Sequence, residues 1–172
     1  MNTLTVTGSA LTGNSATTGG AIWNRGTLTV ASSTFSTNSA TDGGAIYNRA
    51  DSFNRSSVTV RDSVFTANSA TEGGGIYIEV FGTLTVQGST LTGNTAGDSG
   101  GGLYNLGTAT VQQSTLSGNS AGSAGGGIFN AASGTLAVKD SSVLCNTAPG
   151  GADLFNLGLV TLNDSTVGLI GP

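Results

Sequence analysis

The amino-acid sequence predicts an all-β fold, a three-sided parallel β-solenoid, from three observations. A segment like Thr-Leu-Thr-Val recurs at intervals of 24, 30, 26, 25, 27 and 24 residues, a spacing typical of stacked repeats. Each copy contains three short segments with the two-residue apolar–polar period of a strand. Glycine and asparagine separate these segments and mark the corners. The seven copies begin at Thr3, Thr27, Ser57, Thr83, Thr108, Thr135 and Leu159.

The first segment of each copy is the most regular. Its second and fourth positions are apolar in all seven copies, and its other two positions are Thr or Ser except at Ala137 and Leu159. A strand places one of these sets in the core and the other in water. We therefore expect residues 1–172 to form a single solenoid domain of about seven turns of 24–30 residues. The seventh turn is expected to be incomplete, because no third segment is recognisable after Val167.

The second segment reads S-x-F/L-x-x-N, as in Ser33–Asn38, and the third reads GGAIYN, as in Gly43–Asn48. Stacking of parallel turns about 4.8 Å apart turns equivalent positions into columns. The glycine pairs before the third segment are expected to supply a positive φ or a close backbone approach. The second and third segments predict two apolar columns: Leu11, Phe35, Phe65, Leu91, Leu116, Val143 and Val167; and Ile22, Ile46, Ile76, Leu103, Ile128 and Leu154.

Asparagine forms a structural column at the end of the second segment. A stacked amide donates to one neighbouring turn and accepts from the other, and asparagine tolerates the left-handed backbone of a tight corner. A second asparagine column in the third segment has Ile78 in one turn, so we expect it to face inward. The first column is Asn14, Asn38, Asn68, Asn94, Asn119 and Asn146.

Composition excludes several function classes. Charged residues make up 8% of the chain, and its net charge of −4 offers no basic surface for nucleic acid. There is no His to ligate a metal, and the one cysteine, Cys145, which we expect to be packed, cannot form an internal disulfide. No apolar run reaches the roughly 20 residues of a membrane span. We expect no cofactor.

Two motifs resemble a known family. GGAI at Gly19–Ile22 and Gly43–Ile46, with FxxN at Phe35–Asn38 and Phe65–Asn68, is similar to the repeat of chlamydial polymorphic outer-membrane proteins. More broadly, the chain resembles right-handed parallel β-helices of the pectate-lyase-like superfamily. The resemblance implies right-handed coiling and an adhesive or structural role at the cell surface. No signal peptide is visible in this chain.

The third segment also predicts an outward column of rings, here called the aromatic column. It is a candidate face for polysaccharide, a partner protein or a second copy, and stacking that only stabilises the sheet explains it equally well. The aromatic column consists of Trp23, Tyr47, Tyr77, Tyr104, Phe129 and Phe155.

The outward hydroxyls of the first segment predict a flat grid, spaced about 4.8 by 7 Å, similar to the ice-binding face of β-solenoid antifreeze proteins. The general preference of threonine for exposed strands is the competing explanation. The grid consists of Thr3, Thr5, Thr27, Thr29, Thr59, Thr83, Thr85, Thr108, Thr110 and Thr135.

Two carboxylates, Asp42 and Glu72, align in adjacent turns. Such a pair can bind Ca²⁺ weakly or act as acid and base, but a solvated turn is the plainer interpretation. We therefore predict no catalytic residue and no metal site.

These observations favour a non-enzymatic extracellular or cell-surface module, structural or adhesive, that associates with itself end to end into filaments. The insertion Ala50–Ser56, which carries Phe53 and Arg55, is a candidate lateral contact. Polysaccharide or a host surface is the alternative partner. Ice binding is a second interpretation, and a polysaccharide lyase or hydrolase using Asp42 and Glu72 is a third.

Overall fold

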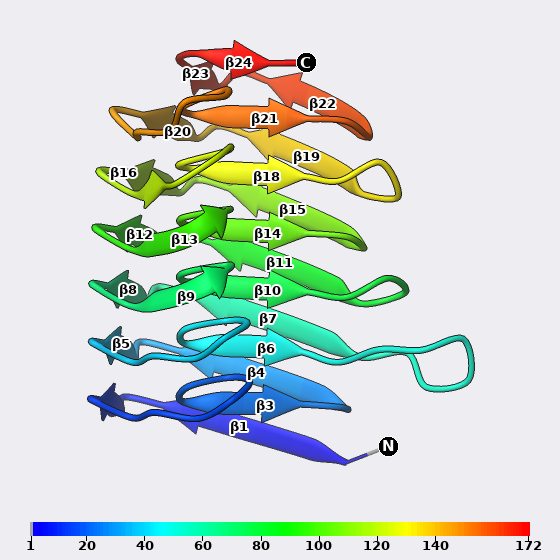
Figure 1. Cartoon of the computed structure of the whole chain (residues 1–172). Helices are drawn as coiled ribbons and strands as arrows, with labels where there is room; N and C mark the ends of the chain where they lie inside the picture. The colour runs from blue at the N-terminus through cyan, green and yellow to red at the C-terminus, as the bar shows by residue number, and fades with distance from the viewer. Residues whose placement is uncertain (1) are drawn as a thin grey trace.

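The computed structural model describes residues 2–172, and every regular element in that range is a strand. Three seven-stranded sheets and one small sheet wrap around a common axis (Figure 1). The first sheet consists, in spatial order, of β1 (Thr3–Thr7), β4 (Thr27–Ala31), β7 (Ser57–Arg61), β11 (Thr83–Gln87), β15 (Thr108–Gln112), β19 (Thr135–Lys139) and β22 (Leu159–Asn163).

The other two large sheets repeat this order of turns. The second sheet consists of β2 (Ala10–Thr12), β5 (Thr34–Ser36), β8 (Val64–Thr66), β12 (Thr90–Thr92), β16 (Thr115–Ser117), β20 (Ser142–Leu144) and β23 (Thr166–Val167). The third sheet consists of β3 (Ile22–Asn24), β6 (Ile46–Asn48), β10 (Ile76–Ile78), β14 (Leu103–Asn105), β18 (Ile128–Asn130), β21 (Leu154–Asn156) and β24 (Ile170–Gly171).

The predicted stacking of equivalent residues is confirmed. Every pairing is parallel, and Leu28 lies opposite Leu4 on one side and Val58 on the other. The inward columns are closed to solvent in the inner turns, and the rings of Phe35 and Phe65 stack with centroids 4.7 Å apart. The core is therefore one narrow column of side chains that runs through all the turns.

The asparagine column is a continuous hydrogen-bonded ladder. In a typical rung, the Asn68 side-chain amide donates to Asn94 Oδ1 at 2.9 Å and to the Phe35 carbonyl at 3.0 Å. In the last rung Asn146 donates instead to the carboxylate of Asp153, again at 2.9 Å. The second asparagine column is buried as expected, and Ile78 within it is fully buried.

The corners use positive φ, but not at the asparagines. The residue before each ladder asparagine is left-handed, as at Thr37 (φ 53°) and Ala67 (φ 52°). The expectation that asparagine itself takes this conformation is wrong, because its side chain is committed to the ladder. The glycine pairs fill both predicted roles: Gly43 has φ 65°, while a Cβ on Gly44 would lie 2.2 Å from the Gly74 carbonyl oxygen.

Three further details differ from the sequence-based expectation. A small fourth sheet consists of β9 (Ser69–Glu72), β13 (Thr95–Ser99) and β17 (Ser120–Ala121). The last turn has a short third strand, since Ile170 pairs with Leu154. Cys145 is exposed rather than packed, because the left-handed corner at φ 60° turns its side chain away from the core.

No helix in residues 2–172 has the length and apolar character that crossing a membrane requires.

Candidate functional site

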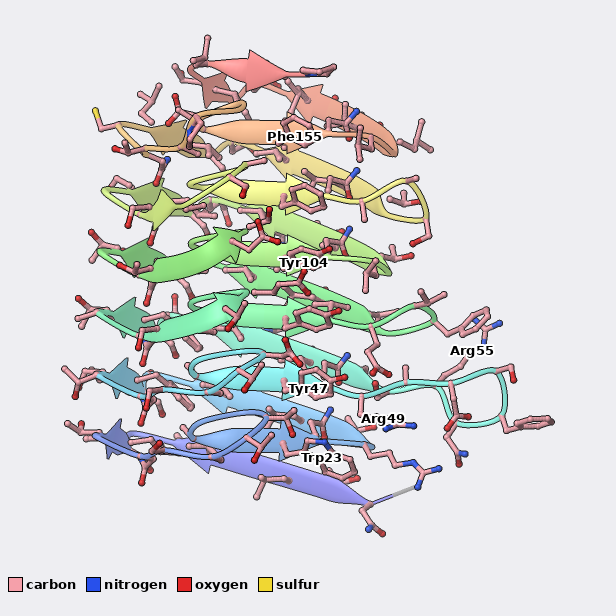
Figure 2. The ribbon with its side chains drawn as sticks, viewed as in Figure 1. Trp23, Tyr47, Arg49, Arg55, Tyr104 and Phe155 are labelled. Atoms are coloured by element: carbon pink, nitrogen blue, oxygen red, sulfur yellow. The ribbon has the colours of Figure 1, made fainter. Side chains whose placement is uncertain are left out.

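The most irregular part of the surface is the corner between the third and first sheets, where the loops after β6 and β10 project. The loop after β6 extends farthest from the body of the solenoid (Figure 1), and Arg49 and Arg55 lie along this side (Figure 2). The predicted insertion Ala50–Ser56 lies in that loop. We call residues 49–56 the insertion loop.

Hydrogen bonds fix the conformation of the insertion loop. The Asp51 carboxylate accepts bonds from the backbone N–H groups of Asn54 at 2.8 Å and Phe53 at 2.9 Å. Both hydrogen bonds lower the pKa of the Asp51 carboxyl, and the bond from Asn54 has the larger effect. Arg25, in the preceding turn, approaches the same carboxylate at 3.3 Å. This arrangement leaves the Phe53 side chain at the loop tip 93% exposed.

Glu79, which follows β10, joins the insertion loop to the body of the solenoid. Its Oε1 accepts a hydrogen bond from the Tyr47 hydroxyl, and its Oε2 accepts one from the Ala50 backbone N–H at 3.1 Å. The Arg49 guanidinium lies 3.6 Å from Oε2. Burial, followed by the bond to Glu79, raises the pKa of Tyr47. The tyrosine is therefore a neutral donor to this carboxylate at physiological pH.

A groove of about 290 Å³ lies between the insertion loop and the loop after β10; we call it the loop groove. A second groove, of about 220 Å³, is adjacent to it, and Val80, Phe81 and Leu106 line both. The Arg55 guanidinium lies 5.8 Å from the centre of the Phe81 ring. The loop groove is lined by Ala50, Asp51, Ser52, Tyr77, Glu79, Val80, Phe81 and Leu106.

The aromatic column runs along the third sheet beside this corner (Figure 2). From Tyr47 to Phe155 its rings stack face to face, with centroids 4.8 to 5.4 Å apart. Each face inside the stack is therefore covered by the next ring. Tyr47 is buried, whereas Trp23 in the first turn is 49% exposed. This geometry favours stabilisation of the sheet over sugar stacking, which needs a free ring face.

Asp42 lies opposite Glu72 in the next turn, and Glu72 lies opposite Ser99. Burial raises the pKa of both carboxyls. The negative charge of Glu79 raises the pKa of Asp42 further, and the negative charge of Asp42 does the same for Glu72. Burial and then the charge of Glu72 raise the pKa of Tyr104 to about 12. Neither carboxyl lines the two grooves described above. Within residues 2–172, no group of three or more His, Cys, Asp or Glu side chains is placed to hold a metal.

The threonine grid follows the register of the first sheet. Thr5, Thr29 and Thr59 lie opposite one another in successive turns. The next outward position along the strands carries Arg61 and Lys139 in two turns. Long charged side chains therefore border the two threonine columns, and a flat hydroxyl surface is limited to those two columns.

Comparison with protein families agrees with this geometry. A family model described as "Right handed beta helix region" matches residues 2–121. The chain belongs to the right-handed β-helix family. Searches of curated proteins and of solved structures gave no match. Membership of this β-helix family establishes the fold, while the function has to be argued from the surface of the chain.

The carboxyl pair of this β-helix predicts a pH-dependent effect on stability. Because the folded-state pKa of Glu72 is raised, its charged form destabilises the fold at neutral pH, and the penalty disappears as the pH falls through that pKa. Glu72→Gln should raise Tm at pH 7 by roughly 2 °C or less. Thermal melts should show this gain shrinking toward pH 4. An equal gain at both pH values would contradict the assignment, and Asp164→Asn at an exposed corner is the control.

Sequence reasoning missed the loop groove. The insertion loop was recognisable from the longest repeat interval, 30 residues. The Val80–Phe81 ridge had a weaker signal, namely two consecutive large apolar residues that follow Glu79, one position after Ile78, which stands where other turns have asparagine. The periodic pattern does not specify how two irregular loops in adjacent turns pack against each other.

Proposed function

We propose that this β-helix is a non-enzymatic structural or adhesive module of the extracellular space or cell surface, and that it associates end to end into filaments. One observation carries the proposal: within residues 2–172, the first and last turns expose apolar core positions beside a strand with one unpaired edge. The inner turns bury the equivalent side chains completely or nearly so.

The first sheet displays this contrast most clearly. Leu4 on β1 is 47% exposed and Leu162 on β22 is 40% exposed, whereas Leu28 in an inner turn is fully buried. β1 and β22 are the edge strands of their sheet. An unpaired strand edge can pair with another chain, and burying apolar surface adds roughly 25 cal/mol per Å².

The two ends are complementary in register. If β1 of one copy pairs with β22 of another, Leu4 lies opposite Val160 and Val6 lies opposite Leu162, as leucines and valines do in the inner turns. On the outer face, Thr161 then lies opposite Thr5, whereas Leu159 lies opposite Thr3. A second copy is therefore the occupant that the end turns fit best, since it continues the same columns.

Other features of the surface support a non-enzymatic module. The Asp42 and Glu72 carboxylates lie outside the two grooves, and the aromatic rings cover one another's faces. A filament presents each surface repeatedly, so weak contacts with a polysaccharide or host surface add up by multivalency. The low charge of the chain, 8% of its residues, is consistent with an extracellular setting.

A charge at the end turn should abolish this association. Leu162→Lys would bury an unpaired ammonium in each junction, which costs several kcal/mol. We therefore expect the end-to-end association constant, measured by sedimentation velocity, to fall at least 100-fold. Thr161→Lys is the matched control, because it places the same charge on the outward face of the same strand.

Two results would refute end-to-end association. One is a wild-type chain that sediments as a monomer at every concentration. The other is a folded Leu162→Lys variant that associates as strongly as the wild type.

A further inference from the structure

A second apolar surface lies on the side of the solenoid, away from the end turns. In the inner turns, the large apolar side chains exposed among residues 2–172 are Phe53, Val64, Val80, Phe81 and Leu157. Three of these five lie on the insertion loop and the loop after β10. Exposed apolar side chains gathered on neighbouring loops are typical of an interaction site.

The insertion loop holds Phe53 in a fixed and exposed position. The Asp51 carboxylate holds the N–H groups on both sides of the loop tip, and Arg25 holds the carboxylate. A pre-ordered loop loses little conformational entropy when it binds. Phe53 therefore has the properties of an anchor residue that inserts into a partner.

The loop groove beside Phe53 has the size and chemistry to receive one ring. Benzene occupies an apolar cavity of about 150 Å³, and the loop groove measures about 290 Å³. Pockets that bind drug-sized ligands measure about 300 Å³ or more, and the loop groove is at the lower end of that range. Its walls include Phe81, Val80 and Leu106.

We propose that a second copy of this chain occupies the loop groove, with Phe53 of each copy inserted into the groove of the other. Anchor and groove lie on the same corner of one chain, which is the self-complementary arrangement that a twofold axis requires. This lateral contact does not involve the terminal turns, so it pairs rods or filaments side by side.

The charges of this corner agree with a second copy. Arg55 extends from the insertion loop, and its guanidinium packs on Phe81 without an acidic partner among the described residues. Asp51 and Glu79 line the loop groove, and each already pairs with an arginine of its own chain, Arg25 and Arg49. A twofold axis brings the insertion loop, with Arg55, to the opposite groove, where it can join the exposed Arg25–Asp51 pair.

The expected dimer is weak. Two fully covered phenylalanines bury roughly 150–250 Å² each, and stable interfaces need about 1,000 Å² or more in total. The Val80–Phe81 ridge and the loop backbone must supply the remainder. We therefore expect association at high protein concentration, with a Kd that depends strongly on Phe53.

Sedimentation equilibrium in a Leu162→Lys background tests the proposal, because that variant removes the end-to-end contact. The background protein should dimerise, and Phe53→Ser should raise the dimer Kd at least tenfold. Val64→Ser is the matched control, since it removes an exposed apolar side chain from the second sheet and should leave the Kd unchanged. A background protein that stays monomeric at millimolar concentration would overturn the proposal.

Complementation then tests whether the groove is the receptor. Leu106→Trp fills the groove and should also prevent dimerisation; Val80→Trp replaces it if the first variant is unfolded by circular dichroism. A mixture of the Phe53→Ser and groove-filled variants retains one intact anchor and one intact groove, so heterodimers should form more strongly than either homodimer. Absence of heterodimers would show that Phe53 docks elsewhere and would refute the proposal.

Discussion

Gly101→Ala is expected to prevent the central turns from stacking. A Cβ at this position would lie 2.3 Å from the Gly126 carbonyl oxygen and 2.4 Å from the Ser120 carbonyl oxygen. Both atoms are backbone and belong to the next turn, so no side-chain rotation relieves the clash. We expect the free energy of unfolding to fall by more than about 4 kcal/mol, or the variant not to fold. Urea unfolding followed by circular dichroism measures this loss.

A glycine four residues earlier provides the control. The nearest atoms to a Cβ on Gly97 are 3.8 Å away, which is ordinary contact. Gly97→Ala should therefore change the unfolding midpoint little. Equal midpoints for the two variants would mean that adjacent turns are not packed backbone to backbone at Gly101.

Asn94→Ala is expected to break the asparagine ladder and to cost about 3–5 kcal/mol. The wild-type side chain donates to Asn119 Oδ1 at 2.9 Å and to the Phe65 carbonyl at 3.0 Å. Its Oδ1 accepts from the backbone and side-chain nitrogens of Asn68. The variant leaves the backbone donor of Asn68 buried without its acceptor, which costs more than the bond itself contributed.

The position of a rung in the ladder should decide the size of the effect. Asn14→Ala removes the same amide from the first rung, where no described turn precedes it and its side chain is exposed. We expect a cost of about 1 kcal/mol or less there. Similar losses for the two variants in chemical unfolding would contradict the ladder as a cooperative element.

The fold was largely predictable because one rule is repeated many times. Each copy places apolar residues at the same alternating positions, and a shift by one residue would turn all of them outward. The register of Leu28 with Leu4 and Val58 follows from this pattern alone. Corner geometry was less accessible, because the need for hydrogen bonds at Asn38 displaces the left-handed residue to Thr37.

The candidate site was less predictable because it arises where the repeat is broken. The sequence shows that the insertion loop exists, but not that Glu79 from the next turn holds it through Tyr47 and the Ala50 backbone. The loop groove depends on these contacts between neighbouring turns. Likewise, the aromatic column was visible as a pattern, while the covering of ring faces depends on rotamers that the pattern does not determine.

Cryo-electron microscopy of the purified wild-type chain tests the central claim most directly. We expect filaments in which β1 of one copy continues the first sheet beyond β22 of the previous copy, at the spacing of about 4.8 Å that is typical of paired strands. Single rods at high concentration, or filaments in which the terminal turns remain exposed, would contradict it.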